Sequence, residues 1–544
     1  MNESKNSHRM SATEKKIVPQ GGRGLPFSAC LVLMVAIYAT GLSRGVTRPW
    51  TGMHDWNGAF FSQLARNLLR YPASVHHGMG VMAMGDAIPP PEERSLYARH
   101  PPALVWMVAA AFAAGGEKEW VARLLPIAAS LATLVLFVRL VHRKHGTETA
   151  VYAGLIYALM PMTVYFGRMV NHEAICLLLM MATLVAWQMR ENSAVGGTRQ
   201  WAASLCAICL ALMIWVDWAG LLFAGLFCAW LVWQWRRRRI GSLPVLIIGG
   251  TAVMTSIGMV VFLVYAGFEG RWADLIAMFN ARRTTAAKDQ LQRVWTHVIQ
   301  NLSWPVFLLA IAGIGVSIGR RLRSKSPTRS RKRIAVERAK SVGLGVLAVT
   351  GLLWVTIFWR QLVIHNYWMF YLGPFIATTA ALSMAAWREP LRARSARLAG
   401  ATTALIVTGM VVFCLIGSRD YFNRVTFPEG LIQACREVHR RTHSGDRVLL
   451  FRRPITIEKH GDYQFRNVTM PQHAYYMDRP FDVDRDAGSI FRRAGDYPLY
   501  VAPYKNRDYP KAGAVIEALR LRFPHEQVGT EMLFQLSGAA EKRG

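Results

Sequence analysis

The stretch "WAGLLFAGLFCAWLVWQWRRRRI", residues 218–240, decides what class of protein this is. Residues 219–235 are almost entirely apolar, and a helix of roughly 20 such residues crosses the ~30 Å hydrocarbon layer of a bilayer. A run of arginines follows at once, as is typical of a helix that ends at the cytoplasmic face. Apolar runs of comparable length recur along the chain. The pattern predicts an integral membrane protein with many helical spans.

The excess of positive charge follows the same pattern. The chain has 544 residues and a formal net charge of +31, which by itself would suggest a nucleic-acid partner. The basic clusters, however, each directly follow an apolar run, at 139–146, 235–240, 319–333 and 388–397. Such alternation orients helices in a membrane. We therefore expect membrane lipids as partners of the chain, and no nucleic acid.

About eleven spans account for the apolar runs and for the sidedness of the basic clusters. They are expected at 25–43, 120–141, 149–166, 174–190, 201–216, 219–235, 243–267, 303–319, 341–359, 367–387 and 400–417. Residues 1–24 are then a cytoplasmic N-terminus before an uncleaved signal anchor, and residues 25–417 form the transmembrane domain. Residues 44–118 form a long outer loop. Its apolar stretch 101–116 is expected as a re-entrant or interfacial helix, because a full crossing would move the basic cluster at 139–146 outside.

Residues 418–544 predict a small α/β domain outside the cytoplasm. Helical periodicity at 428–442 and 512–523 alternates with strand-like segments at 447–451, 498–504 and 531–536. Alternating helices and strands indicate an open sheet. The fold class expected for the whole chain is a polytopic α-helical membrane protein with a small C-terminal extracytoplasmic α/β domain.

The first outer loop places an acidic residue at membrane level. Asp55 precedes an amphipathic helix whose apolar residues, from Phe60 to Leu69, fall on one side, a pattern suited to lying in the membrane interface. Helix capping by itself explains an aspartate at a helix start. Asn57 can cap this helix equally well, which leaves Asp55 available for another role.

A second acidic residue stands at the outer junction between two spans. His172 and Glu173 follow Asn171 there, and capping by Asn171, with Glu173 favoured by the helix dipole, is the simple alternative. With His54-Asp55, this makes two His–acid pairs at one membrane face, where an unpaired carboxylate is costly. These four residues are candidate ligands of a divalent metal ion. Adjacent helical residues point about 100° apart, which argues against both members of a pair reaching one ion.

The order of these motifs resembles a known family. An acid in a long first outer loop and an amphipathic helix are followed by "HPP" (100–102) before a short apolar helix, "EWVARLLP" (119–126) and "GRMVNHEA" (167–174). The combination resembles the membrane glycosyltransferases of the GT-C superfamily (family 39-like), and among them the bacterial relatives of protein O-mannosyltransferases and lipid A aminoarabinose transferases. The resemblance is strongest over residues 44–190 and fades in the C-terminal domain.

The resemblance implies roles for individual residues. The first-loop acid of the family, its proposed catalytic base, corresponds to Asp55. The second-loop acid corresponds to Glu173, which would orient the acceptor or bind a metal. The residue before Pro-Pro is often Lys in the aminoarabinose transferases and is thought to meet the donor phosphate; here it is His100, and the neighbouring Arg99 could substitute for it.

The segment "RQLVIHNYWMFYLGP" (360–374) resembles the late outer motif of the family. Arg360, His365 and Tyr367 are its candidates for binding the donor phosphate. For the arginines, at this motif and before Pro-Pro, snorkelling of the side chain to the membrane interface is the simple alternative.

The resemblance also implies a reaction. Sugar donors outside the cytoplasm are carried on polyprenyl phosphates. Phosphate leaves without being protonated, so one carboxylate that removes the acceptor proton suffices where glycosidases need two, and positive charge stabilises the departing phosphate. We expect a polyprenyl-phosphate-sugar-dependent, inverting glycosyltransferase of the bacterial inner membrane, with Asp55 as base on the periplasmic side. Its acceptor would be a lipid, protein or glycan hydroxyl.

Two other classes of protein fit many spans and a soluble domain. A secondary transporter usually shows paired repeats and helices broken at mid-membrane depth, whereas here the acids gather at one face. A non-catalytic envelope assembly protein would use its C-terminal domain to bind a partner and would not need the paired acids.

Overall fold

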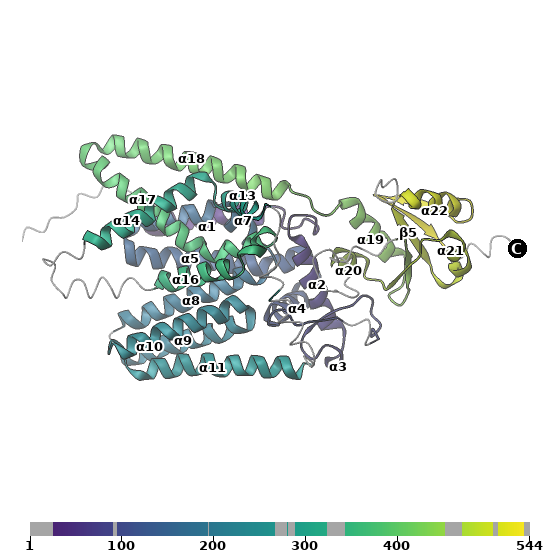
Figure 1. Cartoon of the computed structure of the whole chain (residues 1–544), viewed down its shortest axis with the longest axis horizontal. Helices are drawn as coiled ribbons and strands as arrows, with labels where there is room; N and C mark the ends of the chain where they lie inside the picture. Colours follow the sequence, from purple (N-terminus) through teal and green to yellow (C-terminus); the bar gives the residue numbers. More distant parts are fainter. Residues whose placement is uncertain are drawn as a thin grey trace, which may run out of the picture.

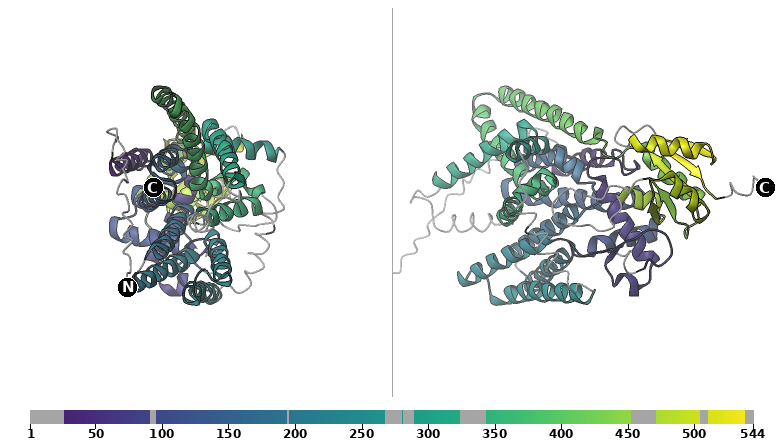
Figure 2. Two further views of the ribbon diagram at one scale, coloured as in Figure 1. Left: turned by 90° about the vertical axis from the view of Figure 1, so that its left-hand side faces the viewer. Right: turned by 45° about the vertical axis from the view of Figure 1, so that its right-hand side comes forward.

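The computed structural model describes residues 26–90, 95–193, 195–266, 280, 289–323, 343–451, 471–503 and 510–537. A bundle of long helices makes up most of the molecule, and a small domain with a sheet stands at one end of it (Figure 1). The right-hand view of Figure 2 shows the same division, and its left-hand view looks along the bundle from the end opposite this domain. The predicted cytoplasmic segment 1–24 lies outside the described residues.

Seven helices of the described chain are long and apolar enough to cross a membrane. They are α5 (Glu119–His145), α8 (His172–Asn192), α9 (Gly196–Val216), α10 (Trp218–Arg236), α11 (Ser242–Tyr265), α17 (Gly373–Arg394) together with the 3-10 helix η3 (Asn366–Leu372), and α18 (Ala396–Asn423). The consecutive helices α13 (Gln290–Leu302) and α14 (Trp304–Arg323) meet at an angle of 93°, and they add an eighth candidate span if the two are counted as one. The predicted polytopic fold is confirmed.

The count of about eleven spans includes segments that form shorter or divided helices. The predicted span 149–166 is divided into α6 (Thr147–Leu159) and α7 (Pro161–Phe166), since Pro161 lacks the N–H needed to continue α6. The predicted spans 25–43 and 341–359 form α1 (Phe27–Ser43) and α16 (Gly343–Ile357), of 17 and 15 residues. The predicted short apolar helix is α4 (Ala103–Gly115).

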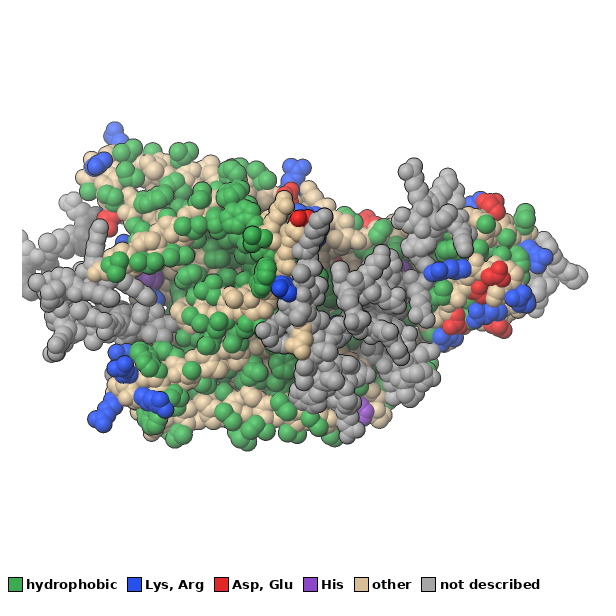
Figure 3. All heavy atoms as spheres, viewed as in Figure 1, with side chains coloured by type: hydrophobic (Ala, Val, Ile, Leu, Met, Phe, Trp, Pro, Cys, Tyr) green, Lys and Arg blue, Asp and Glu red, His purple; other side chains and the backbone are tan. Residues whose placement is uncertain are grey.

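The bundle has a protein-buried centre and an apolar rim. The most apolar windows of α17 with η3 and of α8 are 72% and 67% buried, whereas those of α11 and α18 are each 17% buried. Hydrophobic side chains cover much of the visible face of the bundle, and charged ones gather at its end and over the C-terminal domain (Figure 3). An apolar exterior on helices of this length is what a lipid solvent requires.

The outer loop folds into short elements over one end of the bundle. These are α2 (Asp55–Arg70), α3 (Ala73–His76), the antiparallel strands β1 (Gly80–Met82) and β2 (Ser95–Tyr97), and α4. Helix α2 begins at the predicted acid, but its polar face does not meet water: the Gln63 and Asn67 amides are buried and both donate hydrogen bonds to the carbonyl oxygen of Ala83. The prediction that this helix lies in the membrane interface is therefore wrong. The spacing of polar residues shows which face of a helix is polar, but it does not show whether that face contacts water or protein.

The C-terminal residues form a five-stranded mixed sheet flanked by helices. Its elements are α19 (Glu429–Arg441), β3 (Val448–Leu450), α20 (Pro471–Met477), β4 (Phe481–Val483), α21 (Ala487–Arg493), the 3-10 helix η4 (Ala494–Asp496), β5 (Leu499–Pro503), α22 (Pro510–Arg520), β6 (His525–Val528) and β7 (Glu531–Gln535). The strand order is β4-β3-β5-β7-β6, with β3 parallel to both neighbours and β7 antiparallel to both of its own. Both predicted helices and all three predicted strands are present.

Candidate active site

Asp55 is held at the first position of α2 by the turn that precedes it. The backbone N–H of Gly52 donates to Oδ2 of Asp55 at 2.8 Å, and Nη2 of Arg123 lies 3.3 Å from the same oxygen. His54, at φ 60°, ends the turn in the left-handed region. A Cβ at residue 52 would lie 2.9 Å from Oδ2, so a larger residue here would displace the Asp55 carboxylate. Asp55 therefore serves neither as the cap of its own helix nor as a surface residue.

Arg123 is the fixed cation of this site. Its side chain, on α5, is 1% exposed, and its guanidinium lies 4.0 Å over the ring of Trp50. Nη1 donates to the backbone carbonyl oxygens of Val46 and Arg48. Because both terminal nitrogens and one face of the guanidinium have protein partners, its charge is fixed beside Asp55.

His54 turns away from its neighbour in sequence. Its Nε2 lies 3.0 Å from Oδ1 of Asn366 on η3, and its ring packs edge-on against Tyr367 at 5.0 Å between centroids. Burial lowers the pKa of His54 to about 4, although the Asn366 hydrogen bond raises it in part. The imidazole is therefore neutral at pH 7 and donates from Nε2 to the amide oxygen.

The predicted phosphate-binding residues of the late outer motif fall beside this cluster. The hydroxyl of Tyr367 and Nδ1 of His365 are 2.7 Å apart, and Tyr367 contacts His54 directly. Arg360, in the 3-10 helix η2 (Trp359–Val363), lies 5.8 Å over the ring of Trp359. The structure thus brings His365 and Tyr367 next to the residues around Asp55.

A second cluster surrounds Glu173, the second residue of α8. Asp217, between α9 and α10, accepts a hydrogen bond from the Tyr371 hydroxyl at 2.5 Å. Nδ1 of His100 lies 3.2 Å from the other oxygen of Asp217. The rings of His100 and His172 stack at 4.4 Å between centroids. The predicted phosphate-binding His100 is therefore engaged with an acid that the site prediction did not include.

Glu173 and Asp217 are two buried acids that interact electrostatically. Burial would raise the pKa of Asp217, but the hydrogen bond and charge of His100 lower it below its ordinary value. Oε2 of Glu173 is buried without a hydrogen-bond partner in the part of the chain that the structure describes. An orphaned polar atom of this kind is uncommon in folded proteins and often marks a functional group.

The two clusters are neighbours at one end of the bundle. Phe61 packs edge-on against His172 at 5.0 Å between centroids, and it follows Asp55 by six residues, about 9 Å along a helix. The short helix η3 contributes Asn366 to the first cluster and Tyr371 to the second. The two candidate acids therefore share one region, while each carboxylate has its own set of partners.

The predicted metal ligands do not form one group. No set of three or more His, Cys, Asp or Glu residues within the described segments is arranged to hold a metal ion. His54 belongs to the Asp55 cluster and His172 to the Glu173 cluster, where its Nδ1 lies 2.9 Å from Oδ1 of Asn171. Arg99 is half-buried, and its carbonyl oxygen accepts a hydrogen bond from Nε1 of Trp218 at 2.6 Å.

The C-terminal domain contacts the residues around Asp55. The hydroxyl of Tyr476, on α20, accepts from the backbone N–H of Trp50 and donates to Glu119, both at 2.8 Å. Asp478, whose side chain is 4% exposed, pairs with Arg70 at 2.6 Å and Arg66 at 3.5 Å. Trp50 lies under Arg123, so a single chain of contacts leads from α20 to Asp55.

Several of these residues were not singled out from the sequence. Arg123 stands inside the quoted "EWVARLLP" motif without an assigned role, and Asp217 follows directly on an apolar run, in a tight turn between two spans. Tyr371 and Asp478 gave no sequence signal, because their partners lie 154 and 408 residues away.

Comparisons with known proteins agree with this architecture. Residues 99–265 match a family model described as dolichyl-phosphate-mannose-protein mannosyltransferase, and no curated protein matches the chain by sequence. The structure of ArnT from Cupriavidus metallidurans bound to undecaprenyl phosphate is similar, with a TM-score of 0.58 and 11% identity over 94% of this chain and 98% of that one. The oligosaccharyltransferase AglB from Archaeoglobus fulgidus, in complex with an inhibitory peptide and a dolichol-phosphate, gives a TM-score of 0.56 and 12% identity over 94% and 74%.

The chain therefore has the fold of the GT-C superfamily of membrane glycosyltransferases, and the resemblance found in the sequence is confirmed. At these identities the likeness concerns the fold. What the chain does must be argued from its own residues, because one fold can host many activities.

Proposed function

We propose that this protein is a glycosyltransferase that moves a sugar from a polyprenyl phosphate to an acceptor hydroxyl at the extracytoplasmic face of a membrane. The observation that carries the proposal is the Asp55 carboxylate, fixed by Arg123 and Gly52 at the end of a GT-C bundle that contacts the C-terminal domain. Support for the donor class comes from ArnT, whose structure is bound to undecaprenyl phosphate, and from AglB, whose structure contains a dolichol-phosphate.

Asp55 is the proposed general base. Both fixed contacts of its side chain are made by Oδ2, and the side chain is 13% exposed. Oδ1 accepts no hydrogen bond from the residues that the structure describes, which leaves it for the hydroxyl of an acceptor. A base needs this combination of a fixed orientation and one oxygen within reach of the proton it removes.

The reaction is a single displacement. Oδ1 of Asp55 takes the acceptor proton as the acceptor oxygen forms its bond to the anomeric carbon. The bond from that carbon to the phosphate oxygen breaks, and the polyprenyl phosphate leaves with the electron pair. Since the sugar is attacked once, from the face opposite the leaving group, the configuration at the anomeric carbon inverts.

The second cluster is the proposed site for orienting substrates. Glu173, with its unpaired Oε2, would accept a hydrogen bond from the acceptor or the sugar. His100 stays a proposed donor-phosphate residue together with Arg99, Arg360, His365 and Tyr367, because cationic and hydroxyl groups stabilise the charge on a departing phosphate. The proposed steps are assigned to side chains alone, and the four residues predicted as metal ligands divide between the two clusters.

The membrane orientation is part of the proposal. The basic clusters at 139–146 and 388–397 lie at the ends of α5 and α17, and the positive-inside rule assigns that end of the bundle to the cytoplasm. Asp55 and the C-terminal domain, residues 418–544, then lie on the periplasmic side of a bacterial inner membrane. Such a membrane presents polyprenyl-phosphate donors and lipid, protein or glycan acceptors.

Mass spectrometry of envelope glycolipids and glycans tests the proposal. Cells that lack the protein should lose one glycosylated product, and the wild-type gene should restore it whereas the Asp55→Asn gene should not. Normal membrane insertion of the variant, shown by protease protection, is the control. Restoration of the product by Asp55→Asn would favour the transporter or the assembly protein, neither of which needs a general base.

A further inference from the structure

A charged pocket lies at the end of the bundle opposite Asp55. Helix α5 runs from Glu119, which contacts Tyr476, to His145 at the pocket, and its 27 residues span about 40 Å. The pocket has a volume of about 530 Å³. Its lining residues come from the α5–α6 corner, α14 and α17, and the charged ones are Glu148, Arg320, Arg388, Glu389 and Arg392.

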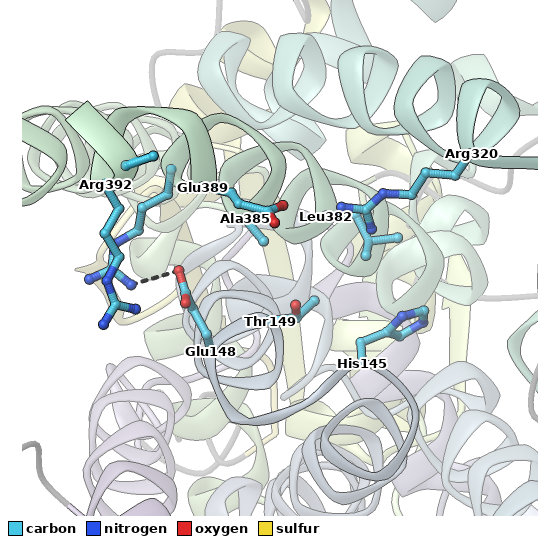
Figure 4. A pocket seen from close by; sticks show the side chains of 10 residues that line it. His145, Glu148, Thr149, Arg320, Leu382, Ala385, Glu389 and Arg392 are labelled. Carbon is cyan, nitrogen blue, oxygen red and sulfur yellow. Dashed lines mark ion pairs between the residues drawn. The ribbon is translucent and has the colours of Figure 1, made fainter. Parts of the chain in front are cut away.

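The pocket carries both signs of charge. Arg388 and Glu148 form an ion pair at 2.6 Å, so their charges offset one another. Arg320 and Arg392 lie on opposite sides of the pocket, with the carboxylate of Glu389 between them (Figure 4). Within the described residues, none of these three makes an ion pair. The pocket thus offers two guanidinium groups and one carboxylate to a ligand.

Neighbouring residues place the pocket at the depth of lipid headgroups. Trp387 precedes Arg388 on α17 and is 49% exposed. Trp233 and Trp235, at the same end of α10, are each 45% exposed and stand beside a run of arginines. Exposed tryptophans and arginines at helix ends are characteristic of the membrane–water interface. A ligand in the pocket would therefore come from the lipid headgroup layer.

We infer that this pocket binds the headgroup of a phospholipid that carries both a phosphate and a primary ammonium, of the phosphoethanolamine type. The phosphate oxygens accept hydrogen bonds from Arg320 or Arg392, and the ammonium donates to Glu389. Guanidinium groups match phosphate oxygens in geometry and charge. A headgroup with negative charge alone would leave Glu389 facing an anion, so the mixed lining selects for the zwitterion. The inference does not depend on the proposed sugar transfer.

Native mass spectrometry of the full-length protein, released from nanodiscs with equal amounts of three lipids, tests this inference. The lipids are phosphatidylethanolamine, phosphatidylglycerol, which lacks the ammonium, and phosphatidylcholine, whose quaternary ammonium cannot donate a hydrogen bond. We expect phosphatidylethanolamine to be retained about tenfold more than either of the others, the factor expected for one charge-assisted hydrogen bond. This comparison needs no variant, so it stands even where a substitution affects folding.

Variants assign the retained lipid to the pocket. The double variant Arg320→Gln/Arg392→Gln should lose it, and Glu389→Gln should abolish the preference for phosphatidylethanolamine over phosphatidylglycerol. Arg143→Gln, an exposed arginine at the same end of α5, is the matched control and should leave retention unchanged. Equal retention of the three lipids, or an unchanged lipid complement in the double variant, would overturn the inference. So would displacement of the lipid by inorganic phosphate alone, because the site would then bind a soluble anion.

Discussion

The guanidinium of Arg123 lies 3.3 Å from the carboxylate of Asp55, although the two residues are 68 positions apart in the chain. The pair sits near the N-terminus of α5, where Arg123 also stacks on Trp50 and donates to two backbone carbonyl oxygens. An ion pair held from so many sides fixes the direction of the carboxylate. The proposed sugar transfer depends on this fixed carboxylate.

Replacing Arg123 by lysine should lower the turnover number at least tenfold. Lysine keeps the charge but not the planar fork that reaches Asp55 and the carbonyl oxygens together. We expect kcat to fall by a larger factor than KM for the donor rises, because the substitution changes the orientation of the Asp55 carboxylate and leaves the donor-binding residues in place. Steady-state kinetics of the purified variant measure this, with Arg143→Lys on the same helix as the control. An Arg123→Lys enzyme with wild-type kcat would show that Asp55 does not need this contact.

Replacing Asp478 by asparagine should loosen the C-terminal domain from α2. Removing one partner of a buried ion pair costs about 3–5 kcal/mol, because the remaining charges lose their compensation, and Asp478 faces both Arg66 and Arg70. We expect a lower melting temperature in detergent and increased proteolysis between the bundle and the domain. Glu517→Gln, which breaks an exposed pair on α22, is the control. Equal melting temperatures for the two variants would contradict the proposed clamp.

The stability of the site should depend on pH through His54. Its pKa is about 4 in the folded protein against an ordinary 6.5, so the unfolded chain binds the proton more readily. The contribution of His54 to the free energy of unfolding is therefore complete above about pH 6.5 and is lost as the pH falls towards 4. The loss is at most about 3 kcal/mol, because part of the ring surface is open to solvent. Thermal melts between pH 7.5 and 4.5 measure this.

The variant His54→Gln separates this effect from other acid-sensitive groups. Glutamine can still donate to Asn366 but does not titrate. The difference in melting temperature between wild type and variant should therefore shrink as the pH falls from 7.5 to 4.5. A difference that stays constant over this range would assign the pH dependence to other groups.

Substitutions of His100 should act on donor binding. If His100 meets the donor phosphate, His100→Leu removes that contact and also leaves the buried carboxylate of Asp217 with one hydrogen bond fewer. We expect KM for the polyprenyl-phosphate donor to rise about tenfold or more, the effect of one lost charge-assisted hydrogen bond. His100→Lys, which can pair with both groups, should largely retain donor affinity. A His100→Leu enzyme with unchanged KM would remove His100 from the phosphate site.

The sequence was sufficient to find the membrane fold and the two candidate acids. Apolar length and the position of arginines are local properties, and an acid at the edge of a span stands out against its apolar surroundings. The glutamate and aspartate positions could therefore be identified before their partners were known. Helix breaks such as the one at Pro161 shorten individual segments without changing this pattern.

The partners of the acids could not be found in the same way. Asp478 contacts Arg70 across 408 residues, and the spacing of polar residues on α2 is the same whether they face water or protein. Arg123 occurs at the end of an apolar helix, where arginines commonly meet the membrane interface. Only tertiary packing distinguishes a buried, fixed guanidinium from a solvated one.

The role of Asp55 as general base is decided by the rate of sugar transfer by the purified Asp55→Asn protein. Asparagine has the size of aspartate and its amide oxygen can still accept from Gly52 and Arg123, but it cannot take a proton. We expect kcat to fall about 10²- to 10⁴-fold, the usual contribution of a general base, with normal membrane insertion and little change in donor affinity. Transfer at the wild-type rate would show that Asp55 is not the base.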